Sequence, residues 1–166
     1  MADYTPEFFE DDDGSEPVLD WLRKLPGYKR RAATAAIEHI LARQGAGVCR
    51  SGWGKWVQGV NGVFELRIRQ DYGTILRNAG LPIPEDEADE AAERHPDILL
   101  RIFCHAHGNR LVLLLAGYDK GKEPQDRRQI KEAKLAEKRL KRWGQRQAAA
   151  AKRAKRAGGR SRKRKS

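Results

Sequence analysis

Three arginines lie in two segments whose residue patterns predict β-strands. In residues 63–69, apolar side chains alternate with charged ones, and a period of two is typical of a strand that buries one face. The charged positions of this segment include Arg67 and Arg69. Residues 98–105 place Arg101 between two apolar residues. Guanidinium groups fixed on a sheet can hold an anion in a set geometry, because their planar fork matches the oxygens of a phosphate.

The charge of the chain is strongly uneven. Its 166 residues carry a formal net charge of +11, yet residues 120–166 alone hold 20 basic and 4 acidic residues. The acidic residues gather in residues 1–16 and 80–97, with seven in each segment. Outside these three segments the chain is still basic, so we expect nucleic acid or a ribosomal surface as the partner. For the C-terminal cations, a role in solubility alone is an equal alternative.

A third segment, residues 111–118, predicts a strand that ends at Tyr118 and leads into a loop with Lys120 and Lys122. The lysines can bind a phosphate backbone, and Lys120 can act in acid–base chemistry if neighbouring cations lower its pKa. The alternative is a solvated loop. Tyr118 can stack on a base or orient a hydroxyl, or it can be a core aromatic. Arg67 can instead pair with a carboxylate such as Glu65.

His105 shares the face of Arg101 if its strand stays regular, and histidine titrates near neutrality, which suits general acid–base catalysis. No His or Cys cluster has metal-ligand spacing, so we expect neither a metal nor another cofactor. Cys49 and Cys104 form no CxxC pair and are expected to be reduced thiols of a cytoplasmic protein. Residues 1–16 lack the apolar run of a signal peptide, and no run is long enough to span a bilayer.

Helices are predicted on both sides of these strands. Pro17 begins a short helix, because proline is favoured in the first turn, and a second helix covers residues 28–44 until Gly45 ends it. Residues 52–62 can add a short strand before the hairpin turn at Asn61. Pro124 begins a long helix that reaches about residue 143. Its predicted apolar stripe comprises Ile130, Ala133, Leu140 and Trp143.

This order of elements predicts an α+β fold with two N-terminal helices, a small, mainly antiparallel twisted sheet of three or four strands, and a C-terminal helix. Residues 1–15 form an acidic segment that is expected to be loose, although its Tyr4, Phe8 and Phe9 can dock. Residues 16–143 form the domain, with an acidic insertion at 80–97. Residues 144–166 form a basic tail that is expected to be disordered. Candidates for binding RNA are Arg69, Lys122, Lys152, Arg153, Lys155 and Arg156.

Several segments, in order, resemble one protein family. WVQGVNGVFELRIR at 56–69 resembles the glycine–aromatic–Glu-Leu-Arg segment of HigB-like toxins, in a phage-derived branch of the RelE/ParE toxin–antitoxin superfamily. LRIF at 100–103 resembles the next strand, and LLLAGYDKGK at 113–122 is similar to the last strand and its lysine-rich turn. IKEAKLAEKRL at 130–140 is similar to the closing helix. The chain departs from the family in the insertion at 80–97, in Leu100 where tyrosine is usual, and in its longer basic tail.

The resemblance implies a microbial-ribonuclease-like fold and a metal-independent endoribonuclease that cleaves mRNA on the ribosome and arrests growth. Such chemistry needs a base for the RNA 2′-hydroxyl, cations for the scissile phosphate and an acid for the leaving oxygen. It implies Arg67 and Arg101 as the phosphate ligands, with Tyr118, Lys120 and His105 as further catalytic candidates. The implied partners are mRNA, ribosomal RNA and a cognate antitoxin, often a helix-turn-helix protein, with no membrane and no small-molecule cofactor.

Two other functions stay open at this point. A non-enzymatic RNA- or ribosome-binding module on the same fold would draw most of its affinity from the basic tail. A ParE-like protein would inhibit a topoisomerase without cleaving RNA. The fold alone does not separate these functions, because one fold can host several of them.

Overall fold

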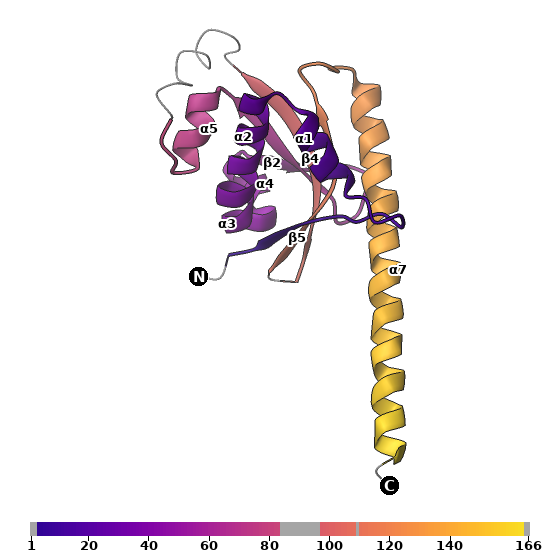
Figure 1. Ribbon diagram of the computed structural model, residues 1–166. Coiled ribbons are helices and arrows are strands. Elements are labelled where there is room, and N and C mark those ends of the chain that lie inside the picture. The colour runs from indigo at the N-terminus through magenta and orange to yellow at the C-terminus, as the bar shows by residue number, and fades with distance from the viewer. Residues whose placement is uncertain (1–2, 84–96, 109, 165–166) are drawn as a thin grey trace.

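A five-stranded mixed sheet lies at the centre of the computed structural model, which describes residues 3–83, 97–108 and 110–164. The strands are β1 (Thr5–Phe8), β2 (Gly54–Trp56), β3 (Phe64–Gln70), β4 (Ile98–His107) and β5 (Leu111–Asp119). Their spatial order is β1-β5-β4-β3-β2 (Figure 1). Strands β2 to β5 pair antiparallel, while β1 runs parallel to β5. The predicted α+β class is therefore confirmed.

Short helices cover one face of the sheet (Figure 1). They are α1 (Pro17–Lys24), α2 (Gly27–Ala36), the π-helical turn η1 (Ile37–Leu41), α3 (Ala42–Gln44), the 3-10 turn η2 (Gly45–Gly47), α4 (Val48–Ser51) and α5 (Tyr72–Asn78). The apolar side of β3, with Leu66 and Ile68, packs into this layer together with alternate residues of β4 and β5. This layer forms the larger of the two buried clusters.

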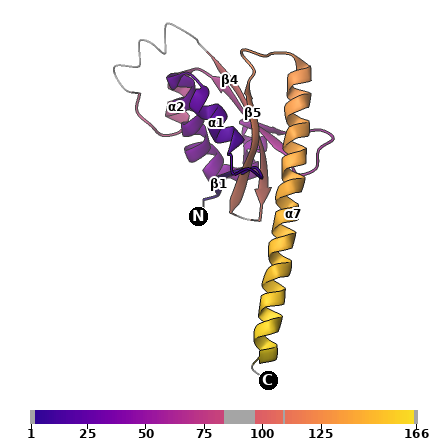
Figure 2. The ribbon, with the colours of Figure 1, turned by 45° about the vertical axis from the view of Figure 1, so that its right-hand side comes forward.

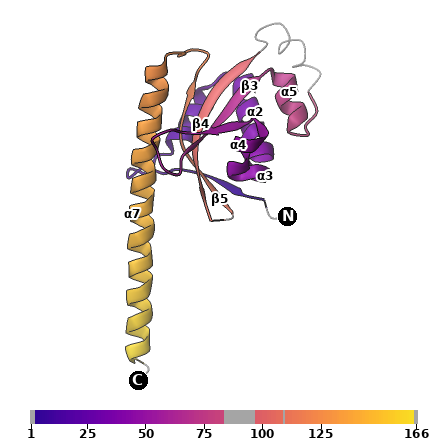
Figure 3. The ribbon, with the colours of Figure 1, turned by 180° about the vertical axis from the view of Figure 1, so that it is seen from behind.

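The long helix α7 (Asp126–Arg164) packs on the opposite face of the sheet. Figures 2 and 3 show it beside the sheet, with its C-terminal half extending beyond it. Ala133 and Ala136 are buried against Phe103 and Leu113. The charged residues of β3 also belong to this face, since a period of two places them opposite the apolar ones. The helix α7 and the sheet together therefore enclose the candidate site.

The N-terminal segment differs from the prediction. Residues 1–15 were expected to be loose, but Thr5–Phe8 forms an edge strand and Phe9 is 1% exposed. The physical reason is backbone pairing with β5, in the register Thr5 to Leu111 and Phe8 to Leu114, which satisfies peptide groups along an edge. The prediction of three or four mainly antiparallel strands was therefore wrong in number, and it missed the parallel pair.

Two helical regions also differ in detail. The helix predicted at 28–44 begins at Gly27 and passes through a π-helical turn before α3, and it ends at Gly45 as expected, where φ is 55°. Helix α5 was not predicted. Asp71 begins it as an N-cap, because its carboxylate accepts a hydrogen bond from the Thr74 backbone N–H at 2.9 Å.

Helix α7 continues far beyond the predicted end near residue 143. It is a single helix of 39 residues, about 58 Å long at the usual rise per residue. The segment from 144 onward, which the sequence suggested would be disordered, is helical as far as Arg164. Ile130, placed in the apolar stripe by the sequence, is 53% exposed, whereas Ala133 is buried and Trp143 is half-buried. The central part of the predicted acidic insertion, residues 84–96, lies outside the described residues.

Phe9 and Asp12 of the N-terminal segment contact the middle of α7. Asp12 forms ion pairs with Arg142, at 2.9 Å, and with Arg146. The guanidinium groups of Arg139 and Arg146 lie over the ring of Phe9, at 5.9 and 5.3 Å from its centroid. These contacts hold α7 against the sheet edge that β1 forms.

No helix in the described residues is both long enough and apolar enough to cross a membrane.

We predict that Gly117→Ala destabilises the fold by about 1–3 kcal/mol, because a side chain there overpacks the core. A Cβ at Gly117 would lie 2.6 Å from Cζ3 of Trp21 on α1. The matched control is Gly144→Ala in α7, where a Cβ meets nothing within 4 Å, and which should gain up to about 1 kcal/mol. Urea unfolding of both variants tests this. Equal stability of the two variants would contradict the packing of α1 on β5.

We predict that Asp71→Ala lowers the free energy of unfolding by about 0.5–2 kcal/mol at neutral pH, through loss of the α5 cap. Hydrogen bonds from Thr74 hold the pKa of Asp71 below its usual value. A lowered pKa in the folded state means that the stabilisation is present above about pH 4 and is lost as pH falls through the folded pKa. Asp71→Asn, which keeps the capping oxygen, should differ from the wild type less and without this pH dependence, as followed by urea unfolding at pH 7 and pH 3.

Candidate functional site

Three predicted site residues form one row across three neighbouring strands. Arg67 on β3 lies opposite Arg101 on β4, and Arg101 lies opposite Tyr118 on β5. Directly paired residues of antiparallel strands project from the same face, so all three side chains belong to the face that α7 covers. The regular register of the sheet thus brings together residues that are 51 positions apart in the sequence.

Glu65 is the anion beside this row, two residues before Arg67 on β3 and opposite Phe103. Its side chain is buried, and Nε2 of Gln129 on α7 donates to both carboxylate oxygens, at 3.1 and 3.2 Å. Arg67 donates to Oε2 through Nε and Nη2, each at 3.4 Å. Nε of Arg101 lies 3.9 Å from Oε1. One carboxylate therefore balances part of the charge of two guanidinium groups and also ties α7 to the sheet.

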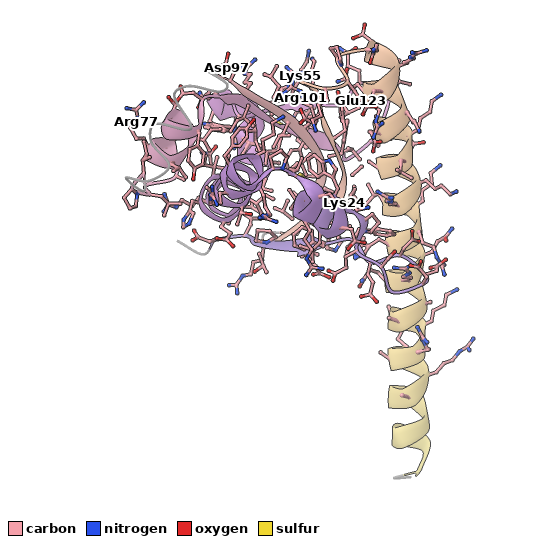
Figure 4. The ribbon with its side chains drawn as sticks, turned by 45° about the horizontal axis from the view of Figure 1, so that its top comes forward. Lys24, Lys55, Arg77, Asp97, Arg101 and Glu123 are labelled. Carbon is pink, nitrogen blue, oxygen red and sulfur yellow. The ribbon has the colours of Figure 1, made fainter. Side chains whose placement is uncertain are left out.

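The two arginines differ in their access to solvent. Arg101 is 5% exposed, and its Nη1 donates to the carbonyl oxygen of Leu100 at 3.3 Å. Burial lowers the pKa of Arg101 from its usual value, and the charge of Glu65 opposes that change. The side chain of Arg67 is 22% exposed. Figure 4 shows Arg101 between the labelled Lys55 and Glu123, within the layer of the sheet. Arg67 is therefore the more accessible of the two cations, and Arg101 is buried beside it on the next strand.

A groove of about 580 Å³ opens beside this row, between the β2–β3 hairpin and α7. Glu65 and Arg67 belong to its wall, and Lys55 and Lys134 add two further cations. Trp56 and Ile130, both about half exposed, also belong to the lining. Glu137 of α7 also lines it, so the groove is open, carries three cations and two carboxylates, and has apolar parts.

Tyr118 lies at the end of the row, away from the groove. Its ring stacks on Phe103 with centroids 6.3 Å apart, and the guanidinium of Arg128 lies 5.9 Å from its centroid. Burial raises the pKa of the Tyr118 hydroxyl, and the negative charge of Glu65 adds to the rise. Tyr118 therefore stays protonated near neutral pH and can act only as a hydrogen-bond donor or a weak acid.

Lys120 and Lys122 follow β5 in a loop that is fixed by Asp119. The Asp119 carboxylate accepts a hydrogen bond from Nζ of Lys29 at 2.6 Å and another from the Gly121 backbone N–H at 3.0 Å. Lys122 is exposed and lines a second cavity, of about 440 Å³, together with Tyr118 and Arg128. Lys120 is half-buried. These lysines therefore face the tyrosine end of the row and do not line the groove.

His105 lies apart from the arginines. It is four positions from Arg101 on β4, about 13 Å along the strand. Its Nδ1 lies 2.7 Å from the carbonyl oxygen of Gly62, so that nitrogen must carry the proton. The ring contacts those of His107 and Trp143, with centroids 6.0 and 6.1 Å away. His105 is thus part of an aromatic cluster that docks α7.

The remaining predicted cations lie outside the row. Arg69 Nη2 donates to the Gly52 carbonyl oxygen at 3.4 Å, near the outer edge of the sheet. The four cations predicted in the tail are exposed on the part of α7 that extends beyond the sheet, and they are Lys152, Arg153, Lys155 and Arg156. The structure therefore separates a compact charged row from a second, extended set of cations.

Sequence reasoning named Glu65 as a possible partner of Arg67, and the structure confirms that pair. It missed the contacts of Glu65 to Arg101 and Gln129, and the contribution of α7 to the site. Gln129 and Lys134 lie five residues apart, on different sides of the helix, and each reaches the groove. A partial signal was present, because Gln129 is one turn before Ala133 and so shares the packed face of the helix. Lys55 was also missed, although its position opposite Glu65 follows once β2 is paired with β3.

Comparison of the chain with protein-family models, with curated proteins and with solved structures found no match. Within the described ranges, no group of three or more His, Cys, Asp or Glu side chains is placed to hold a metal ion.

The fold and the site together define an α+β protein with a row of charged side chains on its sheet, beside an open groove of mixed charge. Glu65 and Arg67 line this groove, whereas Tyr118 is buried at the other end of the row. Such a set can accept a proton at Glu65 and bind a phosphate at Arg67, with Arg101 adding positive charge.

We predict that Glu65→Gln destabilises the protein by about 3–5 kcal/mol, because it leaves two guanidinium groups without their buried counter-charge. The double variant Glu65→Gln with Arg101→Met should recover part of that loss, since it removes one of the unpaired charges. Glu137→Gln, in the same groove but on the surface of α7, is the matched control and should change stability by less than about 0.5 kcal/mol. Chemical unfolding measures all three; a neutral Glu65→Gln would mean that Glu65 does not hold the row together.

Proposed function

We propose that this chain is a toxin of the RelE/ParE type, close to HigB, that cleaves mRNA on the ribosome without a metal. The observation that carries the proposal is the position of Glu65, which accepts hydrogen bonds from Arg67, lies 3.9 Å from Nε of Arg101, and shares the wall of an open groove with Arg67. The family resemblance of the strands that carry these residues supports it, as does the α+β architecture with a C-terminal helix packed on the sheet.

The roles follow from the chemistry of RNA cleavage. Glu65 takes the proton of the 2′-hydroxyl, since it is a carboxylate that lines the groove. Arg67 binds the scissile phosphate, and Arg101 adds positive charge beneath it, where low local polarity strengthens the interaction. Tyr118 is buried and lies away from the groove, and Lys120 does not line it, so water in the open groove supplies the proton for the leaving 5′-oxygen.

The hydrogen bonds from Arg67 to Glu65 are weak enough for a phosphate to replace the carboxylate. At 3.4 Å they are longer than a strong charge-assisted hydrogen bond, which is about 2.7–2.9 Å. A phosphate in the groove can therefore compete for the guanidinium, and the carboxylate that is displaced becomes free to accept a proton. His105 has no part in this proposal, because it is engaged with Gly62 and the aromatic cluster.

The partners in this proposal are mRNA, ribosomal RNA and a cytoplasmic antitoxin that blocks the groove or displaces α7. In this class of toxins the antitoxin is often a helix-turn-helix protein. The groove is closed on one side by α7, so an antitoxin that shifts this helix would also break the hydrogen bonds from Gln129 to Glu65.

One observation favours a second function. Both arginines are engaged by Glu65, while the cations of α7 beyond the sheet are fully exposed. A non-enzymatic module that binds ribosomal RNA through α7 would need no free catalytic group, and this is the alternative proposal.

The test is tightly controlled induction in a bacterium, with mRNA 5′ ends mapped in the same cultures. We predict growth arrest and new 5′ ends with the wild type, and Arg67→Ala should lower cleavage by about 100-fold or more. Arg67→Ala is preferred to Arg101→Ala because Arg67 is partly exposed, so its loss disturbs folding less. Deletion of residues 148–166 keeps Arg146 and its contacts to Asp12, and it should leave the cleavage chemistry in place.

The control is Arg43→Ala, an exposed arginine of α3 far from the row in sequence, which should retain full activity. Soluble wild-type protein that neither arrests growth nor creates new 5′ ends would exclude the endoribonuclease. If growth is arrested without new 5′ ends, and the arrest depends on residues 148–166 and not on Arg67, the binding module is the better account. Arrest through inhibited DNA supercoiling would point to a topoisomerase as the target.

A further inference from the structure

The cations of α7 divide into two sets by their contacts. In the first set, Arg128 pairs with Glu123 and Glu132, and Arg139 donates to a backbone carbonyl at 2.7 Å. Arg142 and Arg146 pair with Asp12 and complete this set. The second set has no ion pair within the described part of the chain and is exposed along the helix. The first set docks the helix, and the second is available to a partner.

Seven cations of the second set form a single line along α7. Their spacing is four, three, four, three, eleven and four residues, and steps of this kind return to the same side of an α-helix. We name this line the cationic ridge, and its members are Arg127, Lys131, Lys134, Lys138, Lys141, Lys152 and Arg156. The ridge is about 44 Å long at the usual helical rise.

The ridge faces away from the sheet. Ala136 and Trp143, which pack on the sheet, lie about half a turn from it. Figure 4 shows nitrogen-tipped side chains along the outer side of α7. Among described residues of this helix beyond its first turn, the acids are Glu132, which is buried and paired with Arg128, and Glu137, beside the ridge. The ridge therefore presents two groups of cations, within residues 127–141 and 152–156, with little negative charge beside them.

We propose that the cationic ridge binds the phosphate backbone of double-helical RNA. Within residues 127–141 its neighbouring cations are about 5–6 Å apart, so several phosphates can be neutralised at once. A step of eleven residues, about 16 Å at the usual helical rise, separates this group from Lys152 and Arg156. A rigid array of cations suits a rigid array of phosphates, because neither partner loses much conformational freedom on binding.

The composition of the ridge favours a duplex over a single strand. Single strands are held by aromatic side chains on which bases stack, and the ridge offers lysine, arginine and alanine but no aromatic ring. In a duplex the bases are stacked inside, so backbone contact is enough, and this contact carries no sequence preference. Lys134 belongs both to the ridge and to the groove, so RNA on the ridge would lie next to the site.

This inference rests on the proposed function only in naming RNA as the nucleic acid. The test is the binding of a blunt RNA duplex of about 20 base pairs to the full-length protein, measured by fluorescence anisotropy over a range of salt concentrations. The wild type is compared with the triple variant Lys131→Gln, Lys138→Gln and Lys141→Gln. Glutamine keeps a similar helix propensity to lysine, and Lys134 is left intact because it lines the groove.

The triple variant should bind more weakly, and the slope of log Kd against log salt should fall by about three, one for each phosphate contact. The matched control removes three exposed cations away from α7, in the variant Arg23→Gln, Arg43→Gln and Arg50→Gln. It should change the slope far less, although the net charge is the same. Circular dichroism verifies that both variants fold.

Two results would overturn the inference. One is a triple variant that binds the duplex like its charge-matched control, because net charge alone would then explain the affinity. The other is a single strand of the same sequence that binds more tightly than the duplex. Binding does not depend on cleavage, so repeating the measurement in the Arg67→Ala protein separates this inference from the proposed function.

Discussion

The charged face of this protein depends on one carboxylate. Arg67 and Arg101 lie directly opposite each other on neighbouring strands, and like charges in that position repel, the more so beneath a helix where water is excluded. Glu65 removes this repulsion and accepts two hydrogen bonds from Gln129 of α7 as well. The same anion therefore permits the arginine row and locates the helix that covers it. The geometry of the site and the docking of α7 therefore depend on the same side chain.

The contacts of Glu65 explain how the same residues can stabilise the fold and bind a ligand. A fully satisfied Glu65 would hold both arginines too firmly for a phosphate to compete, but its contacts to them are long, at 3.4 and 3.9 Å. Its short contacts are to an uncharged amide. The charged groups are thus preorganised without being saturated, which is the condition for electrostatic stabilisation of a transition state. Helix α7 also serves two purposes, because its inner side packs in the core and its outer side carries exposed cations.

Local patterns in the sequence predicted the strands that carry the arginines. Alternation identified β3 and placed Arg67 and Arg69 on its polar face, and the apolar residues around Arg101 identified β4. It did not reveal β1, because a four-residue strand with a parallel partner more than 100 positions away leaves no local signal. The short helix α5 was missed although Asp71 and Thr74 carry its capping signal. The burial of Arg101 and the hydrogen bonds of Gln129 depend on how α7 crosses the sheet, which no local pattern shows. The many charges after residue 144 suggested disorder, although the alanines of that segment favour a helix.

The parallel pairing of β1 has a consequence for the order in which the chain can fold. The strand is made first, yet its neighbour β5 emerges from the ribosome only after about another hundred residues, which takes about 5–20 s at ordinary rates of synthesis. Until then the peptide groups of Thr5–Phe8 have water as their partner and Phe9 has no pocket. Asp12 must wait longer still, for the arginines of α7. The first residues translated are thus among the last to be placed, and they act as a latch that closes on a nearly finished protein.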